Sequence, residues 1–259
     1  MTWIIENEAF VNGDILLSSL NKLNKEVILW NDSFWQTEEY KNFPKNSLFH
    51  GSLGNASRLC KCSLPNIISL CNEERFSSSY LQNNYSKYLL NQNPIFTTIS
   101  ELMEKPSLLD SLKTQKIFAR PNSPLKEFSG RILDKQNLSP ASFDYGFYHS
   151  DMNLPIMLCE YKKIEAEWRF VCVNNSIITG CKYEAETRKG INSTECHEND
   201  PAFLFAQKIA DEKKQKDFAY IIDVCCADEK LWLVEMNPFS GADLYLCNTE
   251  KIIHSIENL

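Results

Sequence analysis

Two carboxylates and an amide near the C-terminal end of the chain stand where a β-strand pattern expects apolar residues. Asp223 follows Tyr220-Ile-Ile, and Glu235 follows Leu231-Trp-Leu-Val, two positions before Asn237. The two apolar runs flank a short polar turn and so predict a β-hairpin. Glu235 and Asn237 share one face of their strand because strand side chains alternate. Such oxygen ligands suit Mg²⁺; the alternative is a hairpin with two solvated charges.

The two carboxylates can share one site only if the hairpin pairs them on the same face. An unpaired carboxylate inside a sheet is costly, so Asp223 and Glu235 should each have a partner or a cation. Direct pairing of these positions requires an odd number of residues in the turn, for example Asp228–Lys230. The sequence therefore predicts an odd-numbered turn and a shared face.

An Asp followed about a dozen residues later by Glu-x-Asn-Pro resembles the metal-binding signature of the ATP-grasp superfamily. An upstream segment agrees with this resemblance, because Glu160 and Glu167 lie seven positions apart in a stretch that resembles the interdomain hinge. In that hinge one acid lies beside the adenine and the second binds the ribose hydroxyls. The resemblance therefore implies nucleotide contacts from Glu160, Tyr161 and Glu167.

A third segment narrows the resemblance to one clade. The superfamily has a strand ending in Lys-Pro before a glycine-rich phosphate loop, but here Arg120 replaces the lysine and the loop carries only Gly130 and Lys126. The segment with Arg120 and Lys126, together with the segments Glu-Trp-Arg-Phe-Val and Glu-x-Asn-Pro-Phe, resembles the motifs of the ATP-grasp clade named for two arginines and one lysine. The resemblance covers roughly residues 85–250 and implies an α+β protein with the ATP-grasp fold.

The resemblance also implies a reaction. ATP-grasp enzymes convert a carboxylate into an acylphosphate that an amine or thiol attacks, so we expect a carboxylate–amine ligase that forms an amide or peptide-type bond with ATP and magnesium. The protein positions groups and neutralises charge in such a reaction, and needs no nucleophilic side chain. The expected nucleotide contacts are Arg120, Lys126, Glu160, Tyr161, Glu167, Arg169 and Lys182; the expected catalytic residues are Arg169, Lys182 and Arg120; the expected metal ligands are Asp223, Glu235 and Asn237.

Two other classes of function stay open at this point. One is a kinase on the same fold, which stops after phosphorylating a small molecule or protein. The other is a non-catalytic protein that uses ATP to bind or assemble a partner. The complete metal set argues against the second class. The acceptor, whether small molecule, peptide or protein, cannot be identified from the sequence.

A second hairpin predicted over residues 167–183 would place three charges together. If Asn174-Asn175 alone form the turn, Glu167 faces Lys182 and Arg169 faces Gly180. The predicted charged face is then a groove for the sugar and phosphates of a nucleotide. The alternative is a solvent-facing ladder worth under ~1 kcal/mol. The predicted core face carries Trp168, Phe170, Ile177 and Tyr183.

The composition excludes several classes of protein. The chain has 259 residues, a formal net charge of −7 and 43% hydrophobic residues, enough for one large or two small domains. The acidic balance argues against a nucleic-acid surface, because phosphate contacts need an excess of Lys and Arg. We expect no signal peptide and no membrane span, since no apolar run approaches ~18 residues. The oligomeric state is left open.

The ten cysteines have no metal-type spacing. We interpret them as reduced, mostly buried thiols, which favours a cytoplasmic location. The alternative is a zinc site at Cys60, Cys62 and Cys71, which has no obvious fourth ligand.

The chain is expected to divide into two parts. Residues 1–95 predict an N-terminal α/β lobe that precedes the ATP-grasp domain, and residues 96–259 predict that domain, with its hinge near residues 159–167. A polar stretch at residues 187–200 predicts a mobile loop. Strands are predicted at residues 3–5, 27–30, 116–121 and 155–158, and helices at residues 10–23, 78–95, 97–112 and 201–216.

Overall fold

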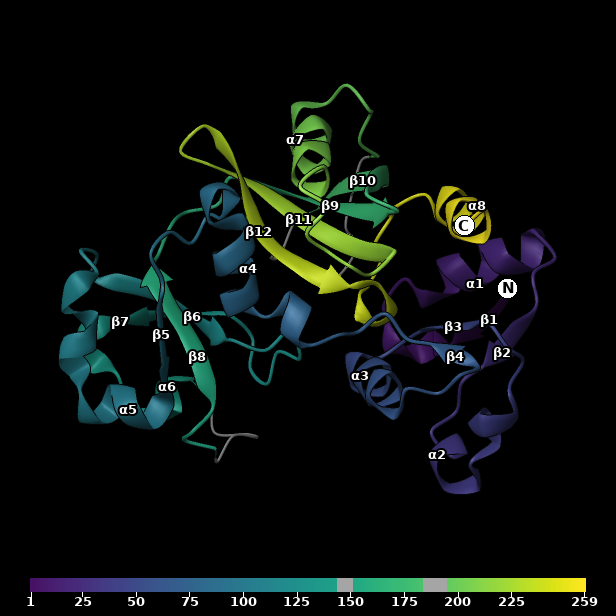
Figure 1. Ribbon diagram of the computed structural model, residues 1–259. Coiled ribbons are helices and arrows are strands. Elements are labelled where there is room, and N and C mark those ends of the chain that lie inside the picture. The colour runs from purple at the N-terminus through teal and green to yellow at the C-terminus, as the bar shows by residue number, and fades with distance from the viewer. Residues whose placement is uncertain (144–150, 184–194) are drawn as a thin grey trace.

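The strands of the protein form three four-stranded sheets over residues 1–143, 151–183 and 195–259, the part of the chain that the computed structural model describes (Figure 1). The first sheet belongs to an N-terminal lobe. The second and third lie on either side of the cavity described below. Helices and strands mix throughout, as the prediction of an α+β fold requires.

The first sheet is parallel, with strand order β2-β1-β3-β4. Parallel strands need crossover connections, and helices supply them here. The Ser52 side chain accepts a hydrogen bond from the Asn55 N–H and so caps α3. The elements are β1 (Thr2–Ile5), α1 (Gly13–Lys22), β2 (Val27–Leu29), α2 (Phe34–Thr37), β3 (Ser47–His50), α3 (Leu53–Cys62) and β4 (Ile67–Ile68).

The second sheet is antiparallel, with order β5-β8-β6-β7. Thr98 caps α5 by accepting from the Glu101 N–H, so the helix begins two residues later than residue 97, where it was predicted to begin. One face of the sheet packs on α5 and α6 around buried Ile117, Leu158 and Phe143. The elements are β5 (Ile95–Thr98), α5 (Ile99–Glu104), β6 (Lys116–Pro121), β7 (Arg131–Asp134), α6 (Pro140–Phe143) and β8 (Pro155–Glu160).

The third sheet, with order β10-β9-β11-β12, carries most of the predicted site. One of its faces buries Phe170 and Ile222 against Phe203 and Ala206 of α7 and Tyr85 of α4. The elements are α4 (Ser78–Tyr85), β9 (Ala166–Val173), β10 (Ser176–Tyr183), α7 (Pro201–Ala210), β11 (Ala219–Ala227), β12 (Lys230–Pro238) and α8 (Thr249–Glu257).

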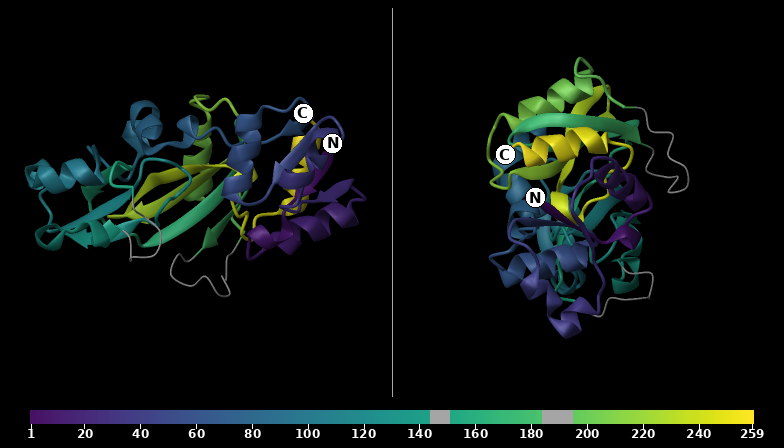
Figure 2. Two further views of the ribbon diagram at one scale, coloured as in Figure 1. Left: turned by 90° about the horizontal axis from the view of Figure 1, so that it is seen from below. Right: turned by 90° about the vertical axis from the view of Figure 1, so that its right-hand side faces the viewer.

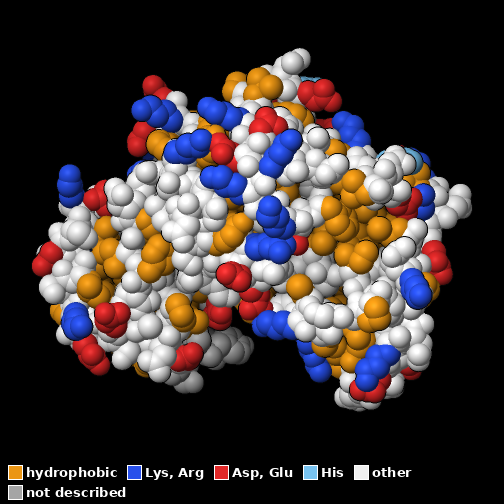
Figure 3. All heavy atoms as spheres, in the orientation of Figure 1, with side chains coloured by type: hydrophobic (Ala, Val, Ile, Leu, Met, Phe, Trp, Pro, Cys, Tyr) orange, Lys and Arg blue, Asp and Glu red, His pale blue; other side chains and the backbone are white. Residues whose placement is uncertain are grey.

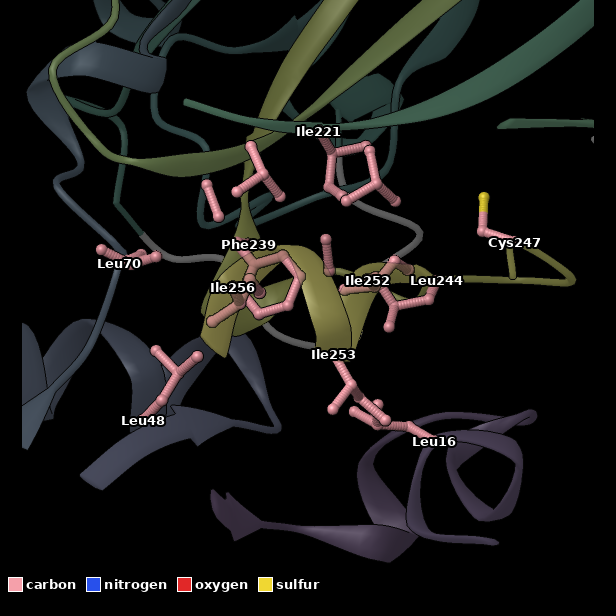
Figure 4. Close-up of a cluster of buried hydrophobic side chains, with 14 of the residues drawn as sticks. Leu16, Leu48, Leu70, Ile221, Phe239, Leu244, Cys247, Ile252, Ile253 and Ile256 are labelled. Atoms are coloured by element: carbon pink, nitrogen blue, oxygen red, sulfur yellow. The ribbon is translucent and has the colours of Figure 1, made fainter. Parts of the chain in front are cut away.

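The C-terminal segment joins the first and third sheets. Leu16 and Leu48 of the N-terminal lobe share one buried cluster with Ile221 of β11 and Ile252 of α8 (Figure 4). The two termini lie at the same end of the molecule in each view (Figures 1 and 2), and Trp3 Nε1 donates to the Glu257 carboxylate at 3.2 Å. The lobe is thereby fixed against the face of the third sheet that carries Arg169 and Asp223.

In the space-filling view, the lower edge of the molecule is hollowed between the part built on the second sheet and the part built on the first (Figure 3). Charged side chains of both signs border this hollow. The expected domain boundary at residues 95 and 96 falls at the start of β5. The chain just before it packs on the third sheet, where the Leu90 N–H donates to the Leu233 carbonyl at 2.9 Å.

Several predicted boundaries are corrected. The helix expected over residues 78–95 ends at Tyr85, and α7 ends at Ala210, three residues before Lys213 takes a left-handed φ of 52°. The strand predicted at residues 116–121 is confirmed. Of the loop expected at residues 187–200, residues 187–194 lie outside the described part.

Short 3₁₀ helices span Asn7–Ala9, Glu39–Asn42, Glu74–Phe76, Ser86–Tyr88, Pro106–Ser111, Lys135–Asn137 and Phe239–Gly241.

None of the helices in the described part of the chain combines the length and apolar composition that a membrane crossing requires.

Candidate active site

The predicted pairing of the two carboxylates is confirmed. Asp223 lies directly opposite Glu235 in the β11–β12 hairpin, and on its other side it lies opposite Arg169 of β9. The three side chains therefore form a row across adjacent strands on one face of the sheet. Asn237 lies two residues beyond Glu235 on the same face.

The predicted odd-numbered turn is wrong. Asp228 and Glu229 alone connect the strands, with φ of 52° and 58°, as a two-residue hairpin turn requires. The register then shifts by one residue between Asp223 and Val224, which is a β-bulge. The extra residue restores the parity that the short turn loses, so Asp223 still faces Glu235.

Glu235 is the centre of a cluster of polar side chains from three elements. Arg120, at the end of β6, donates from Nη1 to Glu235 Oε2 at 2.6 Å, and Lys126 of the following loop donates from Nζ to Oε1 at 2.9 Å. The Asn237 amide donates to Glu235 Oε1 at 3.0 Å and to Asp223 Oδ2 at 2.8 Å. Residues predicted separately to bind phosphate and metal thus lie in one network.

Arg169 holds Asp223 through a two-pronged ion pair. Its Nε donates to Oδ1 at 2.8 Å and its Nη2 to Oδ2 at 2.7 Å. Its Nη1 donates to the Asp243 carbonyl at 2.6 Å, so all three nitrogens of the guanidinium are engaged with protein acceptors. Arg169 is 5% exposed and Asp223 1% exposed, and this pair fixes the carboxylate rather than leaving it to solvent.

The electrostatics differ between the two carboxylates. Burial would raise the pKa of Glu235, but Lys126 and Arg120 hold it well below its usual range. Burial raises the pKa of Asp223, against the opposing effect of Arg169. With Arg120, Lys126 and Arg169 facing two carboxylates, the ionised cluster carries a surplus of positive charge. Such a surplus suits a polyanionic phosphate chain.

The donor set fits a magnesium ion. The Asp223 and Glu235 carboxylates offer oxygen, the ligand type that Mg²⁺ takes, and the Asn237 amide, which here donates its NH₂ group to both carboxylates, would offer its oxygen after turning over. Mg²⁺ usually keeps waters or substrate phosphates as its other ligands. Within the described ranges, no three His, Cys, Asp or Glu side chains are grouped so that they could hold a metal ion. Of the cysteines in the zinc alternative, Cys71 is buried and Cys62 is exposed.

A cavity of about 630 Å³ lies between the second and third sheets and reaches the cluster at Arg120. Phe118 and Gly130 both line the cavity and lie against each other. Residue 130 must be small here, because a Cβ at Gly130 would lie 2.6 Å from the Phe118 ring. The lining comprises Leu90, Asn91, Phe118, Arg120, Gly130, Ile132, Tyr161, Lys162, Ile164, Glu165, Ala166, Glu167, Lys182, Tyr183 and Val234.

The hinge residues divide between the cavity and its surroundings. Tyr161 and Glu167 line the cavity, whereas Glu160 is not among its lining residues and accepts a hydrogen bond from the Lys113 N–H at 2.7 Å. Burial, together with nearby Asp223 and Glu235, raises the pKa of Glu167 to about 7.

The predicted register of the β9–β10 hairpin is wrong away from its turn. Asn174 and Asn175 form the turn as expected, with φ of 50° and 63°. A register shift between Ile177 and Thr179 then moves each later pair by one residue. Glu167 consequently faces Tyr183 instead of Lys182, and Arg169 faces Cys181 instead of Gly180.

The shift exchanges the faces of Lys182 and Tyr183. Lys182 lies opposite Trp168 with its Nζ 5.7 Å from the indole centroid, so it borders the cavity from the strand face that does not carry Glu167. Tyr183, which was predicted to be in the core, donates its hydroxyl toward Glu167 Oε1 at 3.5 Å. The predicted charged groove therefore contains Glu167, Arg169 and a tyrosine.

Two residues that contact Arg169 were missed by sequence reasoning. Asp243 supplies the carbonyl that Arg169 binds, and the Tyr245 ring lies 4.3 Å from the Arg169 guanidinium carbon. Both follow the Glu-x-Asn-Pro strand in a segment without β or helical periodicity. No local signal marks them, since their contacts span more than seventy positions of sequence.

Residues 92–254 match the model of an ATP-grasp domain family, the second family of the clade named for two arginines and one lysine. The chain belongs to this family. The resemblance inferred from the three sequence blocks is thereby confirmed, and with it the ATP-grasp fold. The chain has no significant match among curated proteins.

Solved structures agree on the ATP-grasp fold along almost the whole chain. The D-cycloserine synthetase DcsG superposes with a TM-score of 0.69 at 12% identity, covering 99% of this chain and 98% of that one. The ATP-grasp ligase PsnB, complexed with a minimal precursor, gives 0.61 at 8% identity, covering 99% and 97%. D-alanine–D-alanine ligase from Bacillus anthracis, complexed with ATP, gives 0.60 at 15% identity, covering 99% and 95%. At these identities the likeness concerns the fold alone.

Proposed function

We propose that the protein is an ATP- and magnesium-dependent carboxylate–amine ligase that forms an amide or peptide-type bond through an acylphosphate. Its acceptor is a small molecule, a peptide or another protein. The observation that carries the proposal is the continuity of the cavity with the charged cluster, since Arg120 both lines the cavity and donates to Glu235. One end of the site thus suits a base and sugar, and the other suits phosphates and a metal.

The described residues divide the work of holding the nucleotide. Tyr161 and Glu167 are placed to contact the base and ribose, and Arg120 and Lys126 are placed to bind phosphate oxygens by fork and point charge. Magnesium held by the oxygens of the Asp223, Glu235 and Asn237 side chains would neutralise phosphate charge. Glu165 and Lys162 also line the cavity but are outside the set predicted from sequence.

The chemistry asked of the protein is positioning and charge stabilisation. Arg120 is the cation best placed to act on a transferring phosphoryl group, because its side chain is at the junction of cavity and cluster. Arg169 does not contact the nucleotide in this proposal; it holds the Asp223 carboxylate in position. The names of the similar structures, a synthetase and two ligases, support bond formation over phosphorylation alone.

Product analysis with labelled ATP tests the proposed reaction. A screen of amino acids and peptides as acceptors is expected to yield one that stimulates release of ADP and phosphate together with an amide product. ADP with a phosphorylated acceptor would indicate a kinase. Absence of turnover across the screen, with ATP still bound, would favour the non-catalytic alternative.

Arg120→Ala and Lys126→Ala are each expected to weaken ATP binding about 10-fold or more, because a charge-assisted contact to phosphate is lost. Isothermal calorimetry with excess Mg²⁺ measures the change. Cys62→Ser serves as the control, since Cys62 is exposed and remote from the cavity lining. Unchanged affinity in both variants would remove these residues from the phosphate site.

Glu167→Gln is expected to abolish one pH dependence of ATP affinity. The pKa of Glu167 is raised to about 7. As the pH falls below 7, the side chain becomes protonated and no longer accepts hydrogen bonds from the ribose hydroxyls as a carboxylate. Wild-type affinity should therefore fall on acidification more steeply than that of the variant, which does not titrate. Comparing the two proteins from pH 6 to 8 cancels the titration of ATP itself, and parallel curves would refute the ribose role.

A further inference from the structure

Tyr245 packs against the site in a backbone conformation that its side chain disfavours. Its φ is 51°, in the left-handed region that non-glycine residues rarely occupy. The Tyr245 N–H donates to Asp243 Oδ1 at 2.9 Å, which closes a tight turn around this residue. Strained conformations of this kind persist where surrounding contacts over-determine them, and they concentrate at functional sites.

The ring that this turn projects lies on Arg169. The guanidinium carbon of Arg169 is 4.3 Å from the Tyr245 ring centroid, within cation–π distance. The Tyr183 ring contacts Tyr245 at a centroid distance of 4.9 Å and lies 5.9 Å from the same guanidinium carbon. Arg169 is therefore enclosed by two aromatic rings, and the Asp243 carbonyl fixes its remaining edge.

The enclosed guanidinium determines where the Asp223 carboxylate lies. Both Asp223 oxygens accept from Arg169, and one of them also accepts from Asn237, which in turn donates to Glu235. A rotation of Arg169 would move Asp223 away from the Asn237 amide that joins it to Glu235. The turn at Tyr245 is thus connected to the Asp223 carboxylate through the Arg169 side chain.

We propose that Tyr245 is a positioning residue: its ring holds Arg169, and through Arg169 it holds Asp223 in the geometry that a metal-bound nucleotide needs. This inference rests on the proposed function for its ligand. Groups behind the ligands of a metal typically affect metal affinity or activity about 10- to 100-fold. Tyr245 touches no substrate in this scheme and acts only through the ion pair.

Two substitutions separate the ring from the backbone turn. Tyr245→Phe keeps the ring on Arg169, whereas Tyr245→Asn removes it while supplying a residue that tolerates the left-handed conformation. ATP binding is measured by calorimetry with excess Mg²⁺ and with a chelator. We expect Tyr245→Asn to weaken binding about 10-fold with Mg²⁺ but not with the chelator, and Tyr245→Phe to behave as wild type. Equal loss under both conditions, or no loss in Tyr245→Asn, would overturn the proposal.

A second measurement needs no ligand and so decides the inference even if ATP does not bind. Tyr245→Asn is combined with Asp223→Asn in a double-mutant cycle, with the urea midpoint of unfolding as the readout. Tyr245 and Asp223 interact only through Arg169 in the proposal, so the shift caused by Tyr245→Asn should be smaller in the Asp223→Asn background. Additive shifts would show that Tyr245 is only a packing residue. Failure of wild-type ATP binding alone would overturn the proposed function and leave this result intact.

Discussion

Glu235→Gln is expected to lower ATP-dependent turnover by about 100-fold or more, the scale seen when a charge-stabilising group is removed from an active site. The substitution keeps the size and one oxygen but removes the charge. Phosphates must be held in line most tightly in the transition state, so the rate should suffer more than the affinity. Turnover is measured with the acceptor that the screen identifies.

Glu235→Gln is not expected to weaken the binding of ATP in the absence of metal. In the free protein Glu235 accepts hydrogen bonds from Arg120 and Lys126, and these cations must leave it to meet phosphates. Removing the negative charge frees both cations, so ATP affinity in the presence of a chelator should be unchanged or higher. Glu229→Gln, on the exposed turn of the same hairpin, is the matched control. Undiminished turnover in Glu235→Gln would contradict the role proposed for Glu235 in holding the metal and the phosphates.

The carboxylate pair could be found in the sequence because strand alternation and the positions of Asp223 and Glu235 are local properties. What the sequence did not reveal were two β-bulges. A bulge adds one residue to a strand, and one residue is enough to move every later side chain to the opposite face. In β11–β12 the bulge compensated for a turn one residue shorter than expected. In β9–β10 it followed a correctly predicted turn and exchanged Lys182 with Tyr183 on the face of Glu167.

The long-range contacts of the site could not be predicted from local sequence patterns either. Asp243 and Tyr245 carry no motif, and they matter only because the chain after β12 folds back onto β9. Arg169 was expected to act on the substrate, whereas its three nitrogens all donate to protein acceptors. Residue type and family resemblance selected side chains that the structure brings together, but only three-dimensional packing shows that the Arg169 guanidinium is bound to protein groups.

Arg169→Ala is expected to reduce the free energy of unfolding by about 3–5 kcal/mol, because it leaves the buried Asp223 carboxylate without its counter-charge. For a protein of this size that loss corresponds to a fall in melting temperature of roughly 10 °C. Lys22→Ala is the control, since its pair with Glu250 is exposed and worth under ~1 kcal/mol.

The pH dependence of the Arg169→Ala variant distinguishes an uncompensated charge from a simple loss of packing. Burial already raises the pKa of Asp223, and removing Arg169 removes the main effect that opposes this rise. A carboxyl whose folded-state pKa lies above its unfolded value stabilises the fold at low pH and loses that contribution as pH rises through the folded pKa. The deficit relative to wild type should therefore be smaller at pH 5 than at pH 8 in urea unfolding. Adding Asp223→Asn should recover part of the lost stability at pH 8; a deficit that is independent of pH and unaffected by Asp223→Asn would mean that Arg169 contributes by packing alone.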